Sequence, residues 1–351
     1  MRYLVDVTQK QADEIAKLIN VGKYQTVAQF ILTAIENQIY IENTGSEPLS
    51  SIVAARKDSD SLNKSDLVVI KDSRNIALVE IKSQPKTVAA PDFSGLAASL
   101  YKTKEENCWL WGQTNKIFPV KIGLRVLYAI IGSEQWLDLE EFKEKAADIA
   151  AGYGTAIRKY EDKKNKIRDE RISAGLPDEK EFKSKFRYKG HFLAYMRKDG
   201  KLDGAMPFLR FANLNKDEKG KIFIGLTEPG LNFARIENPV IDHNDFEKSF
   251  SQTEIDFYLD YISKNVKGEA SAIKWVLNKI TNGINDRNSI NKELNREIAP
   301  SWGETSEAVV NTQRAGLMAR MFELGLLQKK KEGITVAYII ADRGKNFLEK
   351  S

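Results

Sequence analysis

The amino-acid sequence contains an internal repeat, and this feature constrains the fold more than any other. Residues 224–234, IGLTEPGLNFA, match residues 339–348, IIADRGKNFL, from the leading apolar residues through an acid and a glycine to an Asn-Phe pair. Each copy follows a charged turn, NKDEKG or KKKEG, and an apolar segment precedes each turn. Such a repeat indicates one supersecondary unit built twice. We expect a strand, a turn, a strand and a short closing helix in each copy.

Helix signals precede the second copy. Ser251 and Glu254 form a capping box, and further helices are predicted at 270–284 and 304–324, the last ended by Gly325. The polar residues on the flank of the longest helix are of types that reach base edges or phosphates: Asn311, Thr312, Gln313, Arg314 and Arg320. Three lysines are expected at the tip of the following hairpin: Lys329, Lys330 and Lys331.

The stretch NTQRAGLMARMFELGLLQKKKEGITVAYIIADRG resembles the recognition helix, strand, wing and strand of winged helix-turn-helix domains. The resemblance covers 251–351 and, more loosely, 110–240. It implies that the long helix and the lysines contact double-stranded DNA. Other interpretations stay open. Arg314 and Arg320 are also placed to pair with Glu307 and Glu323, the lysines are also typical of a solvated turn, and the first copy suits protein contacts as well as DNA.

The first forty residues have a second distinct pattern. Residues 2–7 alternate as a half-buried strand does, Thr8 caps a helix that ends at Gly22, and Thr26 caps another. The stretch GKYQTVAQFILTAIENQ resembles the second half of the ribbon-helix-helix family of the Arc, MetJ and CopG repressors.

This second resemblance implies a dimer joined by paired strands. It would direct Arg2, Leu4 and Asp6 to the bases, and the backbone amides at Thr26 and Val27 to a phosphate. Leu4 and Asp6 depart from what base reading needs, because one is apolar and the other is repelled by phosphates. The module is therefore interpreted as a DNA-binding element or as a dimerisation device alone.

An enzymatic alternative comes from SDLVVI and IALVEIKS, which predict a hairpin. They resemble the site of PD-(D/E)XK nucleases, in which Asp66 and Glu80 would hold Mg²⁺ and Lys82 would assist the attacking water. That fold also needs a later strand. The segment KIGLRVLYAII would have to supply it, although its pattern is equally typical of a helix.

Composition restricts the remaining choices. The chain has 351 residues and a net charge of +5, which suits a nucleic-acid partner without requiring one. Its single cysteine, Cys108, excludes an intramolecular disulfide, and no apolar run is long enough to span a membrane. Phosphate-binding and nucleophile-elbow motifs are missing. We expect a cytoplasmic protein without a cofactor, Mg²⁺ being implied only by the nuclease alternative.

Together these patterns predict a mainly α fold with short β elements. The expected parts are a ribbon-helix-helix module at 1–43, a linker with a small hairpin at 44–109, and winged-helix-like domains at 110–240 and 241–351. The combination resembles uncharacterised prokaryotic regulators of archaeal type. We expect a homodimeric transcriptional regulator that binds double-stranded DNA, with a metal-dependent nuclease and a protein-interaction scaffold as the alternatives.

Overall fold

The computed structural model describes residues 9–20, 27, 30, 31, 34, 70–71, 75–76, 85–167, 170–332 and 335–350. The chain divides into two units, Met1–Gln84 and Pro85–Ser351, and each is described by itself. In the first unit, α1 (Gln9–Asn20) lies where a helix after Thr8 was predicted, and it buries Ala12 and Ile15. The strands β1 (Ile70–Lys71) and β2 (Asn75–Ile76) pair antiparallel where a hairpin was expected.

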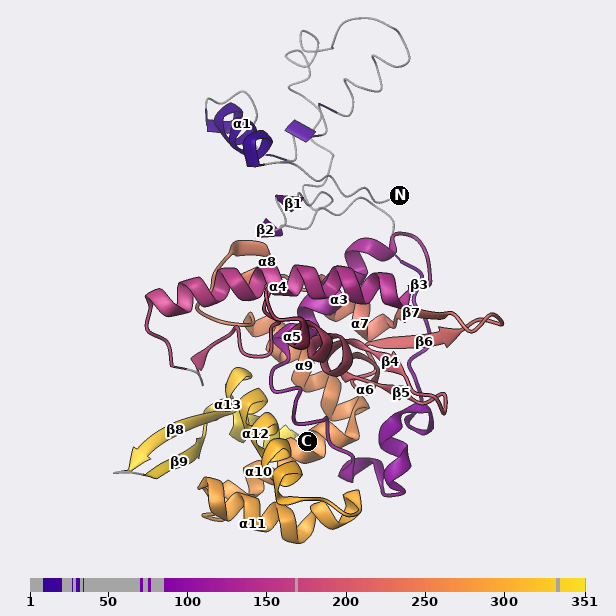
Figure 1. The fold of residues 1–351 in the computed structure, drawn as a ribbon. Coiled ribbons are helices and arrows are strands. Elements are labelled where there is room, and N and C mark those ends of the chain that lie inside the picture. The colour runs from indigo at the N-terminus through magenta and orange to yellow at the C-terminus, as the bar shows by residue number, and fades with distance from the viewer. Residues whose placement is uncertain are drawn as a thin grey trace, which may run out of the picture. The chain divides into compact units, whose positions relative to one another are not determined.

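The second unit is mainly helical and has small antiparallel sheets, in agreement with the predicted fold class (Figure 1). Within the described residues, no helix combines the length and the apolar character that crossing a bilayer requires. The elements up to the first copy of the repeat are α3 (Phe118–Ile131), β3 (Leu137–Asp138), α4 (Leu139–Lys163), α5 (Phe182–Arg187), the π-helix Tyr188–Leu193, β4 (Tyr195–Met196), β5 (Leu202–Asp203) and α6 (Ala205–Phe208).

The first copy consists of β6 (Ala212–Lys216), β7 (Ile222–Leu226) and α7 (Glu228–Arg235). The second consists of β8 (Leu327–Glu332), β9 (Thr335–Ile340) and α13 (Asp342–Lys350). The helices between the copies are α8 (Pro239–His243), α9 (Gln252–Asn265), α10 (Lys267–Thr281), α11 (Arg287–Glu297) and α12 (Glu307–Glu323). The division predicted between 240 and 241 stays a prediction, as does the one between 109 and 110.

The two copies fold in the same way. In the first, Thr227 N donates to Phe211 O at 3.1 Å, which joins the end of β7 to the start of β6. In the second, Ala341 N donates to Leu326 O at 3.0 Å, which joins β9 to β8. The strand, turn, strand and closing helix predicted from the repeat are therefore confirmed, including a hydrogen bond at matching positions.

The same carbonyls explain the glycine of the repeat. A Cβ atom on Gly230 would lie 1.9 Å from Phe211 O, and one on Gly344 would lie 2.4 Å from Leu326 O. Real Cβ contacts are not this short, so each closing helix packs directly on the backbone that begins its hairpin. A side chain at either position would push the helix away.

An earlier segment adds to each hairpin on the side of its second strand. In the first copy, β3 pairs with β7 through Leu137 and Ile224, so that the strand order is β3-β7-β6. In the second copy, Asp286 forms an antiparallel bridge with Ala337 of β9, and Tyr338 N donates to Asn285 O at 2.7 Å. The spatial order is therefore the same in both copies.

The segment KIGLRVLYAII lies in α3, which begins with Pro119 in its first turn. Proline suits that position because its missing N–H has no helical partner there. The nuclease interpretation required a strand at this place, and the structure has a helix there instead. Nearly every side chain of α3 is buried, which accounts for its largely apolar sequence. The buried Lys121 is paired with Glu254 at 2.9 Å.

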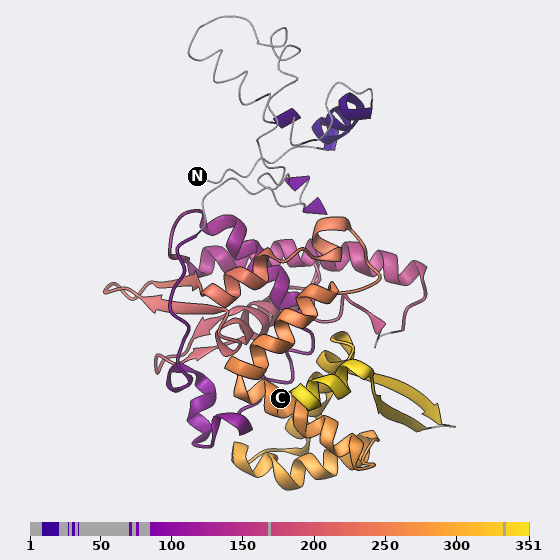
Figure 2. The same ribbon diagram turned by 180° about the vertical axis from the view of Figure 1, so that it is seen from behind.

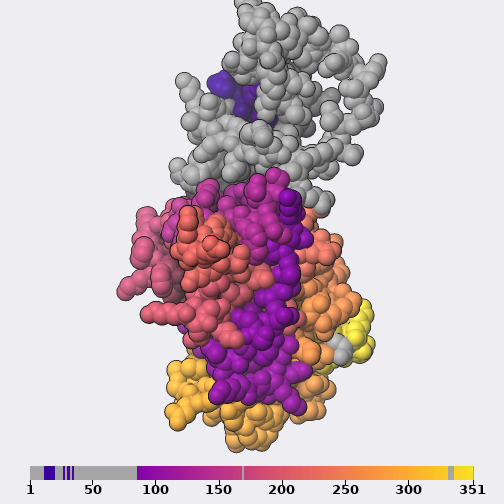
Figure 3. All heavy atoms as spheres, turned by 90° about the vertical axis from the view of Figure 1, so that its right-hand side faces the viewer, coloured from indigo at the N-terminus to yellow at the C-terminus, as the bar shows by residue number. Residues whose placement is uncertain are grey.

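Residues 85–107 run along the outside of the second unit (Figures 2 and 3). Near the start of this segment, Val88 N donates to Leu226 O of β7 at 2.8 Å. Near its end, Trp302 Nε1 donates to Asn107 O at 2.7 Å. The segment therefore connects the first copy of the repeat to the helices that precede the second copy.

Arg320 of α12 is fully buried. Its Nε and Nη2 donate to the two carboxylate oxygens of Glu269 on α10, at 2.7 and 2.9 Å, and its Nη1 donates to Thr114 O at 2.6 Å. The prediction that Arg320 contacts DNA is wrong, because the guanidinium is buried and its hydrogen bonds join α12 to α10 and to the 110–114 segment.

We expect Arg320→Met to lower the free energy of unfolding by about 3–5 kcal/mol, because it leaves Glu269 buried without its partner. Urea denaturation measures this change. Arg296→Met is the matched control, since the Arg296 side chain is 64% exposed in its pairs with Glu293 and Glu297; its cost should stay below about 1 kcal/mol. Similar losses in the two variants would contradict the assigned role of the buried pair.

Candidate functional site

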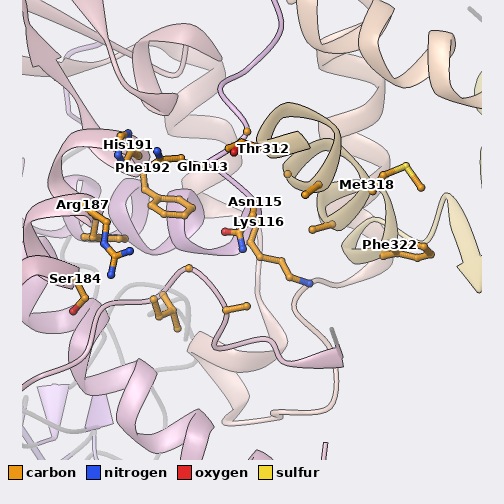
Figure 4. Close-up of a pocket in the computed structure, with 18 of the residues that line it drawn as sticks. Gln113, Asn115, Lys116, Ser184, Arg187, His191, Phe192, Thr312, Met318 and Phe322 are labelled. Atoms are coloured by element: carbon orange, nitrogen blue, oxygen red, sulfur yellow. The ribbon is translucent and has the colours of Figure 1, made fainter. Parts of the chain in front are cut away.

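A groove of about 1150 Å³ lies between α12 with the β8–β9 hairpin on one side and residues 174–192 on the other. Residues 112–116 pass between these walls. Figure 4 shows Ser184, Arg187, His191 and Phe192 on one side, and Thr312, Met318 and Phe322 of α12 on the other. The groove is therefore built from segments that are far apart in the sequence.

Two glycines set the contact between α12 and the 112–116 segment. A Cβ atom on Gly316 would lie 1.9 Å from Gly112 O, and one on Gly112 would lie 2.2 Å from Thr312 O. The two backbones are thus in direct contact, and this contact positions the α12 wall. Neither glycine was singled out from the sequence, since no local pattern marks a contact across some 200 residues.

We expect Gly316→Ala to destabilise the protein by about 1–3 kcal/mol through overpacking, although alanine favours a helix more than glycine does. Thermal unfolding gives the sign of the change. Gly95→Ala serves as the control, because a Cβ atom at Gly95 would meet nothing within 4 Å among the described residues beyond its own chain neighbours. A stabilised Gly316→Ala variant would show that the two backbones can separate freely.

The charges lining the groove are distributed unequally. On the side of residues 158–192, Arg158 lies 3.5 Å from Asp178, and Arg187 lies 3.6 Å from Glu181, so each cation faces an acid. The opposite wall, formed by the start of α11, by α12 and by the hairpin, contributes three cations: Arg287, Arg314 and Lys329. Among the described lining residues, no aspartate or glutamate belongs to that wall. It is therefore a positively charged surface.

Arg314 is the most enclosed of these cations, with 6% of the residue exposed. Its Nε donates to Asn291 Oδ1 at 2.8 Å, and Asn291 Nδ2 donates to Asn311 Oδ1 at 2.5 Å. Burial lowers the pKa of Arg314, and the nearby Arg287 lowers it further, whereas a hydrogen bond with Tyr338 acts in the opposite direction. Neutral groups thus fix the orientation of this guanidinium.

Other side chains complete the groove. Lys329 Nζ lies 4.8 Å from the centroid of the Phe322 ring, a cation–π contact that presents the ammonium along this wall. His191 is half-buried, and burial lowers its pKa below the usual 6.5, so it is neutral at pH 7. The charge of the groove at neutral pH therefore comes from its lysines, arginines and carboxylates.

The structure separates the predicted residues of α12. Thr312 and Arg314 line the groove, as does Lys329 of the hairpin. Asn311 acts through Asn291, by the hydrogen bonds given above. Gln313 is 5% exposed, so the expectation that it reads DNA is wrong: it faces the protein interior.

The lysines of the second copy are not at a turn. They belong to β8, where Lys329 pairs with Tyr338, Lys330 with Ala337 and Lys331 with Val336. Successive side chains of a strand point to opposite faces. Lys329 accordingly lines the groove, while Lys330 is exposed and does not line it. The side chain of Lys331 lies outside the described part of the chain.

Several predicted residues fall outside the described residues: Arg2, Leu4, Asp6, Thr26, Asp66, Glu80 and Lys82. Val27 is described and is helical, as predicted. Among the residues that the structure does describe, no group of three or more histidine, cysteine, aspartate or glutamate side chains is arranged to hold a metal ion.

Four cations of the groove were not predicted: Lys116, Arg158, Arg187 and Arg287. For one wall, a usable signal was the alternation of basic and aromatic residues in FKSKFRYKGHF, 182–192. The other cations are single residues in separate elements, and only folding brings them together.

Comparisons with family models, with curated protein sequences and with solved structures returned no match.

Proposed function

We propose that this protein binds double-stranded DNA through the groove and acts as a dimeric transcriptional regulator. The observation that carries the proposal is the wall formed by α11, α12 and the β8–β9 hairpin, to which Arg287, Arg314 and Lys329 contribute charge and, among the described lining residues, no carboxylate does. A surface of one sign attracts the phosphate backbone, and that attraction supplies most of the sequence-independent affinity for DNA.

The order of the elements supports a winged-helix interpretation of this region. Helix α10, the bridge at Asp286, α11, α12, β8 and β9 follow one another as the helix, strand, two helices and two strands of that fold do. The family resemblance noted in the sequence places DNA against the third helix and the hairpin, and both belong to the positive wall.

The burial of α12 changes the proposed mode of contact. Because Gln313 and Arg320 are buried, this helix has few side chains left to read base edges. We therefore assign the positive wall mainly to phosphate contacts, which position a protein on DNA without specifying sequence. Sequence recognition and dimerisation are assigned to the ribbon-helix-helix module proposed for residues 1–43.

We expect the affinity for a duplex to fall steeply between 50 and 200 mM salt. Proteins that make six to ten phosphate contacts lose about 10³–10⁵-fold in affinity over this range. The double variant Arg287→Gln/Lys329→Gln should flatten the logarithmic salt slope by about 1.8, at about 0.9 for each lost phosphate contact. Fluorescence anisotropy with a labelled duplex measures both quantities.

Lys219→Gln is the control for this experiment. Lys219 is exposed in the turn between β6 and β7 and does not line the groove, so its replacement should leave the slope unchanged. An equal effect of the control and the double variant, or duplex binding that does not respond to salt, would argue against the groove as the DNA site.

A further inference from the structure

Arg314 differs from the other buried arginine of α12 in what surrounds it. Arg320 is bound by both oxygens of Glu269. Within the described residues, no ion pair of the Arg314 guanidinium with a carboxylate is found, and its Nε donates to the amide oxygen of Asn291 instead. Burying a cation without an opposite charge is costly, so this arrangement calls for an anion from outside the chain.

The site is organised before any ligand arrives. Asn311 orients Asn291, and Asn291 holds the Nε edge of Arg314, which leaves the guanidinium in one orientation at the groove. Arg287 is close enough to lower the pKa of Arg314 and is itself exposed, at the start of α11. A planar guanidinium with a fixed edge matches the oxygens of a phosphate group.

The depth of the guanidinium indicates which kind of phosphate fits. A residue that is 6% exposed is reached by a group that protrudes into the groove. A backbone phosphodiester carries a sugar on each side and a single negative charge, whereas a phosphomonoester ends in three free oxygens and carries a charge of about −1.5 to −2 at pH 7. Arg314, Arg287 and Lys329 together suit the second group better.

We infer that Arg314, with Arg287 and Lys329, forms a seat for a phosphomonoester. This inference rests on the proposed function in that the seat lies in the DNA-binding groove, and it adds the chemical class of a second ligand. The group belongs either to a small phosphorylated effector, such as a nucleotide, or to a phosphorylated DNA end. Phe322 lines the same wall, where its ring contacts Lys329 and Tyr338.

The test compares two duplexes of one sequence, one with 5′-phosphates and one with 5′-hydroxyls, and titrates the full-length protein separately with inorganic phosphate and with adenosine monophosphate. We expect either the 5′-phosphate to tighten duplex binding by about tenfold, the scale of one or two charge-assisted hydrogen bonds, or one of the free ligands to bind and raise the unfolding temperature. The first result identifies a DNA end, and the second a small effector.

Arg314→Gln should abolish whichever effect is seen, and Arg314→Lys should retain only part of it, because lysine keeps the charge but not the fork. Since Arg314 is buried, the exposed Arg287→Gln is a second variant that should weaken the effect while the fold is kept; Lys219→Gln should change nothing.

Equal affinity for the two duplexes together with no binding of either free ligand would overturn the inference. An effect that survives Arg314→Gln in the folded protein would do the same. Salt-dependent binding of the 5′-hydroxyl duplex tests the proposed function separately. If that binding is absent while phosphate or adenosine monophosphate still binds at Arg314, the phosphomonoester site is supported and the DNA proposal is contradicted.

Discussion

The buried pair of Arg320 and Glu269 is the interaction on which the arrangement of the second unit depends. One guanidinium binds both carboxylate oxygens on α10 and also the carbonyl of Thr114, so three segments meet at one charge. A buried ion pair adds little net stability over a hydrophobic contact, but a buried charge without its partner is strongly destabilising. The pair therefore favours the one arrangement in which both partners meet. The direct backbone contact of Gly112 with Gly316 beside it keeps α12 in place.

The groove follows from this packing. With α12 held against residues 112–116, its remaining free side carries Thr312, Arg314 and Phe322 toward residues 174–192. The two walls differ in charge, since one pairs Arg158 and Arg187 with acids, whereas no aspartate or glutamate among the described lining residues belongs to the other. An anionic ligand compensates the second wall, which is why DNA phosphate and, at Arg314, a phosphomonoester are the partners that we propose.

The sequence was most informative where contacts are local. The capping box of Ser251 and Glu254 is present, and Gly230 and Gly344 mark equivalent close contacts in the two copies of the repeat. It was least informative about which face of α12 is free. Gln313, Arg314 and Arg320 are all polar residues of one helix, yet one faces the interior, one lines the groove and one is paired inside the protein. The residues that decide this lie on α10 and in the 110–116 segment.

The sequence by itself determined the repeat, the capping box that begins α9, and the mainly helical class with short strands. These properties depend on side-chain periodicity, on capping residues and on hydrogen bonds between near neighbours, all of which are visible within a short stretch of chain. Only the tertiary structure decided that Arg320 is internal, that Lys329 and Lys330 are separated by the alternation of β8, and that Arg287, Arg314 and Lys116 share one groove. Burial and charge pairing depend on distant segments that meet in space, and no local pattern carries that information.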